Sequence, residues 1–183
     1  MEAKCVFIDI DDTLNPSNGH VSSYTKDVMT RLKEKGIIVI VDTGRSAKYA
    51  IEKAKEANLS NYIISSNGAE VYDYVNDVII FQQSIPDEIV KKVYRYCQRM
   101  GLTLILNTLF NRYINKKDYK YNNEPVEYFS NIDEVLEDNS INQLVILSNN
   151  YDRMLVIPNM FKEKFPNLKV VHSSISLIEE RRI

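Results

Sequence analysis

The first eighty residues alternate between short apolar segments and longer amphipathic ones. Residues 5–10, 37–41 and 62–65 are almost entirely apolar and rich in β-branched side chains, as strands buried on both faces of a parallel sheet are. Residues 22–35 and 46–58 carry apolar side chains at helical spacing. The order strand, helix, strand, helix, strand predicts a parallel sheet with right-handed crossovers, and therefore an α/β fold.

The pattern changes after Ser66-Asn67-Gly68. A hairpin is predicted next, and then a helix that begins at Pro86 and ends before Gly101. The later elements include further strands and two helices, with expected bounds of 102–106, 111–114, 143–147, 168–172 and 176–179 for the strands and 132–138 and 151–165 for the helices. This mixture predicts a second, α+β subdomain. We expect a core over 1–82, the second subdomain over 83–178, and a return toward the core over 179–183.

Composition narrows the function and the location. The apolar share of 44% and the charged share of 26% are those of an ordinary globular protein. A formal charge of -2 argues against a nucleic-acid partner. No segment approaches the roughly 20 apolar residues that span a membrane, and Met1–Lys4 does not begin a signal peptide, so the cytoplasm is the expected location. Cys5 and Cys97 are expected to be buried, reduced thiols.

Three acids, Asp9, Asp11 and Asp12, follow the first predicted strand. If the extended conformation continues past Ile10, the side chains of Asp9 and Asp11 point to the same side. Two carboxylates at that separation repel each other unless a cation or a proton lies between them, and Mg²⁺ is the natural hard cation. The alternative is a turn in which the aspartates bond to local backbone, which is the commoner meaning of an isolated Asp-x-Asp.

Two further polar turns follow the second and third predicted strands. The first, residues 42–46 (Asp-Thr-Gly-Arg-Ser), supplies a hydroxyl, a glycine, a guanidinium and a helix N-terminus, which together suit a phosphate group. Its structural alternative is a strand-to-helix turn with a helix cap. The second is Ser66-Asn67-Gly68. Because open α/β sheets bind ligands at the carboxyl ends of their strands, the three turns together predict one site.

These segments resemble the haloacid dehalogenase (HAD) superfamily of phosphohydrolases, specifically the Cof-type branch with an α+β (C2B) cap. The resemblance is carried by residues 7–14 (Phe-Ile-Asp-Ile-Asp-Asp-Thr-Leu), 42–45, 65–73 and 84–90. It implies a HAD-like Rossmannoid core with the second subdomain inserted as a cap. The chain departs from the family at Asp12, where Gly is frequent, and at Asp42, where Ala or Ser is frequent.

The resemblance also implies residue roles. Asp9 would be the nucleophile that forms an aspartyl-phosphate, and Asp11 the general acid and then the general base. Mg²⁺ would be held by the Asp9 side chain and the Asp11 main-chain carbonyl. The residues expected to bind phosphate or substrate are Asp12, Thr43, Gly44, Arg45 and Asn67. Residues 15–21 would form a flap over the site.

In the family, the chain returns from the cap with a lysine and an acidic Gly-Asp-x-x-Asn-Asp-like motif, and neither is found before Ile183. The resemblance therefore implies a C-terminally truncated member with weaker Mg²⁺ binding and slow or absent hydrolysis. It also implies that the first strand lies at an open apolar edge, which a second copy or another polypeptide would cover.

The leading hypothesis is a Mg²⁺-dependent phosphatase of small phosphorylated metabolites, sugar phosphates among them, with impaired activity. The alternative is a catalytically inactive remnant that serves as a binding or protein-interaction module. A dinucleotide-binding domain is excluded because no Gly-x-Gly-x-x-Gly follows the first strand.

Overall fold

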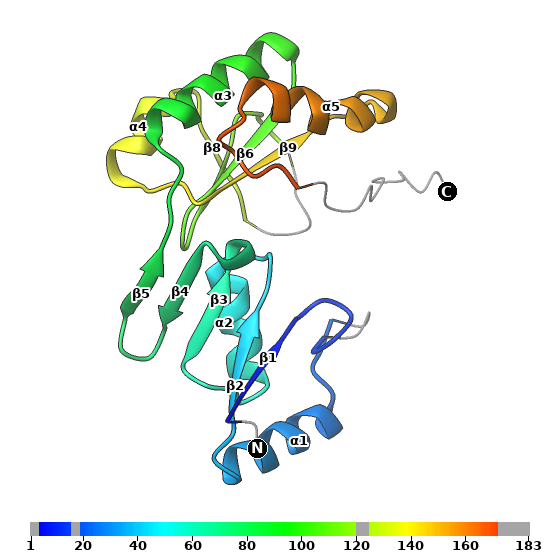
Figure 1. Cartoon of the computed structure of the whole chain (residues 1–183), viewed down its shortest axis with the longest axis vertical. Helices are drawn as coiled ribbons and strands as arrows, with labels where there is room; N and C mark the ends of the chain where they lie inside the picture. Colours follow the sequence, from blue (N-terminus) through cyan, green and yellow to red (C-terminus); the bar gives the residue numbers. More distant parts are fainter. Residues whose placement is uncertain (1–3, 16–18, 120–124, 172–183) are drawn as a thin grey trace.

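The computed structural model describes residues 4–15, 19–119 and 125–171 (Figure 1). The described chain forms two sheets and two hydrophobic clusters, one for each half of the sequence. We refer to residues 4–82 as the N-terminal part and to residues 83–171 as the C-terminal part. The predicted strand at 176–179 and the return segment at 179–183 lie outside the described residues.

The sheet of the N-terminal part has the order β1-β2-β3-β4-β5. Its first three strands are parallel and the last two antiparallel, with bounds of β1 (Cys5–Ile8), β2 (Ile38–Asp42), β3 (Tyr62–Ser65), β4 (Glu70–Asp73) and β5 (Val78–Gln82). The two crossovers contain α1 (Ser23–Glu34) and α2 (Ala47–Glu56). The predicted α/β fold is thereby confirmed.

Local chemistry explains both helices. The Ser22 hydroxyl accepts a hydrogen bond from the backbone N–H of Thr25 and so caps the start of α1. Helix α2 places Ala47, Ala50 and Ala54 against the sheet, and all three are fully buried. Such small side chains let the helix backbone lie close to β2 and β3, which holds the N-terminus of α2 at the carboxyl edge of the sheet.

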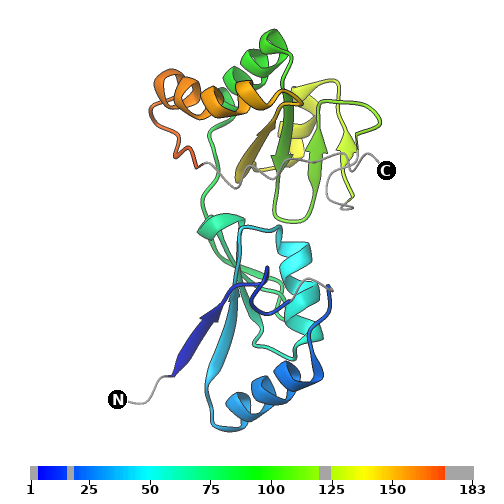
Figure 2. The same ribbon diagram turned by 90° about the vertical axis from the view of Figure 1, so that its right-hand side faces the viewer.

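Helices α1 and α2 cover the same face of this sheet (Figure 2). Val39, Val41 and Ile63 point into the covered face and are buried, whereas Phe7 is 59% exposed. Neither helix covers the other face of the sheet, so the expectation of strands buried on both faces is wrong for β1 and also for β2, where Ile38 is 46% exposed. Cys5 is exposed for the same reason, in contrast to the predicted burial, while Cys97 is buried as predicted.

The C-terminal part packs helices against a second sheet of order β8-β7-β6-β9. Its elements are α3 (Asp87–Met100), β6 (Thr103–Asn107), β7 (Arg112–Ile114), β8 (Glu127–Tyr128), α4 (Ile132–Asp138), β9 (Gln143–Leu147) and α5 (Tyr151–Lys164). Strand β8 was not predicted, and residues 168–171 form no strand. In the part of the chain that the structure describes, no helix is both long and apolar enough to span a membrane.

The two parts meet through the turn between β6 and β7 and through the segment before β9. Leu109 joins the hydrophobic cluster of the N-terminal part, and the ring of Phe110 lies edge-on to Tyr72 with 5.4 Å between centroids. The side-chain amide of Gln82 donates to the side-chain oxygen of Asn142 at 3.4 Å. We propose the connection between β5 and α3, residues 83–86, as the boundary between the two subdomains.

Candidate active site

Three turns, at the carboxyl ends of β1, β2 and β3, are joined by direct bonds. The backbone N–H of Asn67 donates to the Thr43 carbonyl at 3.2 Å, and that of Ser66 to the Arg45 carbonyl at 3.0 Å. The Arg45 guanidinium donates to both Asp11 carboxylate oxygens, each at 2.9 Å. The structure thus brings the three turns into one site.

The turn after β1 differs from the expected extended conformation. The strand ends at Ile8, and the backbone N–H of Leu14 donates back to the Asp9 carbonyl at 3.2 Å. Ile10 and Leu14 are fully buried and anchor this turn, and Asp12 has a left-handed φ of 57°. The condition for Asp9 and Asp11 to point to one side by strand alternation is therefore not met. All three aspartates are exposed to solvent.

The bidentate pair between Arg45 and Asp11 fixes the orientation of that carboxylate. Two parallel N–H to oxygen bonds match the planar guanidinium to the planar carboxylate, which a lysine does not reproduce. Arg45 is itself held over the ring of Tyr49, at 5.3 Å from the centroid. The Tyr49 hydroxyl accepts a hydrogen bond from the Asn15 amide at 3.3 Å, so α2 supports the β1 turn at two points.

Thr43 shapes the second turn. Its side chain is buried, and its hydroxyl accepts the backbone N–H of Arg45 at 3.2 Å. The hydroxyl proton is left for a second partner such as a phosphate oxygen. Ser46 is the N-cap of α2 but makes no side-chain cap hydrogen bond, so the first N–H groups of this helix suit an anion.

Gly44 and Asn67 lie against each other. A Cβ atom at position 44 would be 2.8 Å from Oδ1 of Asn67, so only glycine fits this turn without displacing the asparagine. Ser66, Asn67 and Gly68 have successive left-handed φ values of 52°, 57° and 86°. Left-handed backbone at a residue with a side chain costs on the order of 1 kcal/mol, and such strain is typical of functional sites.

Glu70 supports this strained turn, and sequence reasoning missed it. The residue is only 1% exposed, and its carboxylate accepts hydrogen bonds from the hydroxyls of Ser65 at 2.5 Å and Ser66 at 3.2 Å. The Asn142 amide of the C-terminal part donates to the other carboxylate oxygen. Burial raises the pKa of the Glu70 carboxyl. The sequence feature that could have indicated this role is an acidic residue at the start of a predicted strand, a few positions after two serines.

A second buried charge holds the segment after residue 18. The Lys53 ammonium is buried and donates to the Gly19 carbonyl at 2.9 Å and to the Glu56 carboxylate at 2.8 Å. Glu56 also accepts the backbone N–H of Val21 at 3.0 Å. The bond from Lys53 holds the pKa of Glu56 below its usual value. Residues 19–21 are thereby attached to α2, while residues 16–18 of the predicted flap lie outside the described residues.

The oxygen atoms that the β1 turn can offer to a metal ion are few, and they suit an ion that takes most of its ligands from water and substrate. Among the described residues, no three His, Cys, Asp or Glu side chains gather into a metal site. Asp11 is engaged by Arg45, so this residue can offer its main-chain carbonyl rather than its carboxylate. The Asp9 carboxylate is exposed and makes no ion pair within the described ranges. One carboxylate, one carbonyl, water and phosphate form a donor set that Mg²⁺ accepts.

An open α/β sheet with aspartates and polar turns at the carboxyl ends of its strands belongs to a class of folds that bind ligands at that edge, and the groups in these turns suit a phosphate. A model of the haloacid dehalogenase-like hydrolase family matches residues 6–179. The chain therefore belongs to the haloacid dehalogenase-like hydrolases, in agreement with the resemblance found in its motifs.

Individual relatives agree with this assignment. A putative phosphatase of Buchnera aphidicola subsp. Baizongia pistaciae is 34% identical over 112 residues, which are 61% of this chain and 42% of that protein. A haloacid dehalogenase-like hydrolase from Bacteroides thetaiotaomicron superposes with a TM-score of 0.78 at 17% identity, over 91% of this chain and 65% of that one. A sugar phosphatase of haloacid dehalogenase subclass IIB superposes with a TM-score of 0.66 at 23% identity, over 85% of this chain and 63% of that one. The two superpositions establish the fold. The chain spans less than half the length of the curated relatives that it matches.

Proposed function

We propose that this chain acts as a Mg²⁺-dependent phosphatase of small phosphorylated metabolites, with sugar phosphates as the leading substrate class. The observation that carries the proposal is the joining of the β1 turn, which bears Asp9 and Asp11, to the Thr43-Gly44-Arg45 turn and to Asn67. Membership of the hydrolase family supports the reaction class. The sugar phosphatase among the similar structures supports the substrate class.

Asp9 is the proposed nucleophile because its carboxylate is exposed at the end of β1. Its oxygen attacks phosphorus, the phosphorus–oxygen bond to the substrate breaks, and an aspartyl-phosphate forms. Asp11 enters the reaction protonated and donates its proton to the departing alkoxide, which leaves a carboxylate. That carboxylate then takes a proton from the water that hydrolyses the aspartyl-phosphate, which releases inorganic phosphate and restores the Asp9 carboxylate and the protonated Asp11. The Arg45 pair holds the ionised Asp11 carboxylate, the form present between the two proton transfers, in a fixed orientation.

The phosphoryl oxygens would be held by the Thr43 hydroxyl, the Gly44 backbone N–H and the Asn67 side chain. The N-terminus of α2 adds a favourable dipole for the anion. Mg²⁺, held by the Asp9 carboxylate and the Asp11 carbonyl, would neutralise charge on the transferring group. In this arrangement the C-terminal part acts as a cap that contributes substrate contacts.

The test is hydrolysis of p-nitrophenyl phosphate by the full 183-residue chain with and without Mg²⁺, with Asp9→Asn as the control. We expect hydrolysis that requires both the metal and Asp9. A rate that is the same for both proteins would refute the phosphatase and favour a binding module. Beryllium fluoride, which mimics a phosphoryl group on aspartate, gives a readout without turnover. With Mg²⁺ it should raise the melting temperature of the wild type and leave that of Asp9→Asn unchanged.

A further inference from the structure

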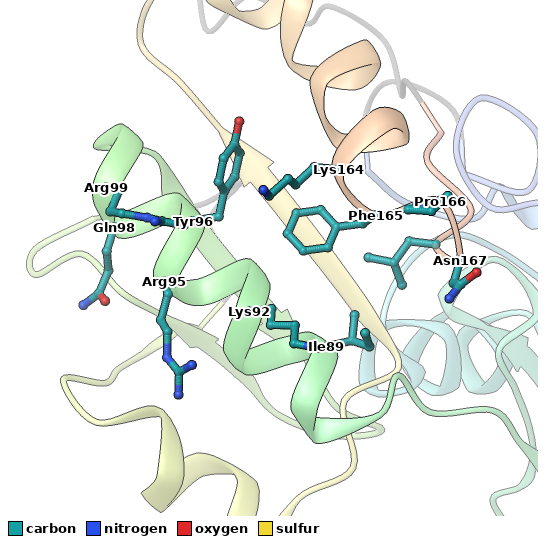
Figure 3. Close-up of a pocket in the computed structure, with 11 residues that line it drawn as sticks. Ile89, Lys92, Arg95, Tyr96, Gln98, Arg99, Lys164, Phe165, Pro166 and Asn167 are labelled. Atoms are coloured by element: carbon teal, nitrogen blue, oxygen red, sulfur yellow. The ribbon is translucent and has the colours of Figure 1, made fainter.

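A cavity of about 710 Å³ lies between α3 and the end of α5 in the C-terminal part (Figure 3). These two helices lie at the end of the molecule that is farthest from the N-terminal sheet (Figure 1). The cavity is therefore separate from the candidate active site. Its volume falls in the range of about 300–1,000 Å³ that is usual for small-molecule sites.

Positive charge gathers around this cavity. Lys92, Arg95 and Arg99 follow one another along one stripe of α3, and Lys164 is the last residue of α5. No carboxylate lines the cavity, and none of the four cations forms an ion pair in the ranges that the structure describes. The whole chain has a formal charge of -2, so this concentration of cations is local. Unpaired cations around a concave surface attract an anion.

One wall of the cavity is aromatic, and its rings pack against one another. The Tyr96 ring packs edge-on against Phe161 and Phe165, with 5.3 Å and 5.9 Å between ring centroids, and the two phenylalanines stack at 5.5 Å. Tyr96 lines the cavity from α3, and Lys164 and Phe165 line it from the end of α5 (Figure 3). Arg95 points away from α5 in the same view and so belongs to the rim. A flat apolar group can stack here next to an ammonium.

We propose that this cavity binds a small phosphorylated aromatic compound of nucleotide size. Lys92 and Lys164 hold the phosphate groups, the ring stacks on Tyr96 with Phe165 at its side, and Arg95 and Arg99 strengthen the field at the rim. A solvated helix face would account for the lysines and arginines alone. It does not account for their placement around a cavity with an aromatic wall and no acid.

The test is calorimetric titration of the full chain with ADP in EDTA, which excludes metal-dependent reactions at the candidate active site. We expect one binding site for ADP, and binding at least about tenfold weaker for pyrophosphate and for adenosine, because each supplies one half of the recognition. Lys92→Glu/Lys164→Glu should weaken ADP binding by at least about tenfold. The matched control, Lys35→Glu/Lys55→Glu, makes the same charge change on the N-terminal part and should bind as the wild type does.

Asp9→Asn separates this site from the proposed phosphatase, because it should retain ADP binding while losing hydrolysis. The proposal is overturned if ADP fails to bind at millimolar concentration, or if the Lys92/Lys164 variant, shown by circular dichroism to be folded, binds as tightly as the wild type. Loss of ADP binding in Asp9→Asn would place the nucleotide at the other site. If pyrophosphate binds as tightly as ADP, the aromatic ring contributes nothing to binding, and the proposal of a phosphorylated aromatic ligand is overturned.

Discussion

Replacement of Glu70 with alanine is expected to lower the free energy of unfolding by about 3 kcal/mol. The Glu70 carboxylate accepts hydrogen bonds from Ser65, Ser66 and Asn142, and the residue is 1% exposed. Alanine would leave these three donors in a buried space without their acceptor, and each such loss costs about 1–3 kcal/mol. Three such losses amount to about 3–9 kcal/mol, and because the two serine hydroxyls can rotate toward other acceptors we expect the lower end, about 3 kcal/mol.

A second variant, Glu70→Gln, isolates the charge. Burial raises the pKa of Glu70 in the folded chain above its ordinary value of 4.5, so folding favours the protonated carboxyl. The resulting contribution to stability is complete below pH 4.5 and is lost as the pH rises through the folded-state pKa. Glutamine does not titrate. The wild type should therefore lose stability relative to Glu70→Gln across this interval, with a slope of at most about 1.4 kcal/mol per pH unit.

The measurement is urea unfolding followed by circular dichroism, repeated at several pH values from 4.5 upward, with Glu137→Ala as an exposed-glutamate control. A free energy for Glu70→Ala within about 0.5 kcal/mol of the wild type would contradict the hydrogen-bond argument. A difference between wild type and Glu70→Gln that stays constant with pH would contradict the buried-charge argument.

Three further changes test the site. Gly44→Ala brings a Cβ to 2.8 Å from Oδ1 of Asn67 and displaces that side chain, so beryllium fluoride binding should weaken about tenfold. Arg45→Lys should lower kcat/KM about tenfold, with the free energy of unfolding changed by less than about 1 kcal/mol because the pair is partly exposed. Glu56→Gln should lower the free energy of unfolding, measured with urea near pH 7, by about 1–2 kcal/mol. Since the pKa of Glu56 lies below 4.5, the wild type should lose this advantage only as the pH falls below that value.

Elements defined by local patterns were predicted well from the sequence. The strand at 62–65 and the helix at 132–138 have the expected bounds, because apolar spacing and flanking turn residues specify them locally. Strand β8 has only two residues and is defined by its pairing with β7, so no local sequence pattern predicts it. The expected extended conformation after Ile10 was wrong, because the burial of two side chains, Ile10 and Leu14, makes the chain turn there instead.

Long-range contacts were the least predictable part of the site. The convergence of the three turns follows from the parallel topology of the sheet, and the alternation of strands and helices in the sequence predicts that topology. The contact between Glu70 and Asn142 joins residues 72 positions apart and depends on how the two parts dock. The roles of Asp9, Asp11, Asp12, Thr43, Gly44, Arg45 and Asn67 stay predictions, as do the cytoplasmic location, the impaired activity and a partner at the β1 edge.

The order of the strands in the N-terminal sheet has a consequence for how the chain is made. Each of these strands lies beside the one that precedes it in the sequence, from β1 to β5. A chain that emerges from the ribosome therefore always has the pairing partner of its next strand already synthesised, and the N-terminal unit of a chain generally folds first. Within the described residues, this sheet needs no strand from the later part of the chain. The bond between Glu70 and Asn142 can form only after the C-terminal part has been made.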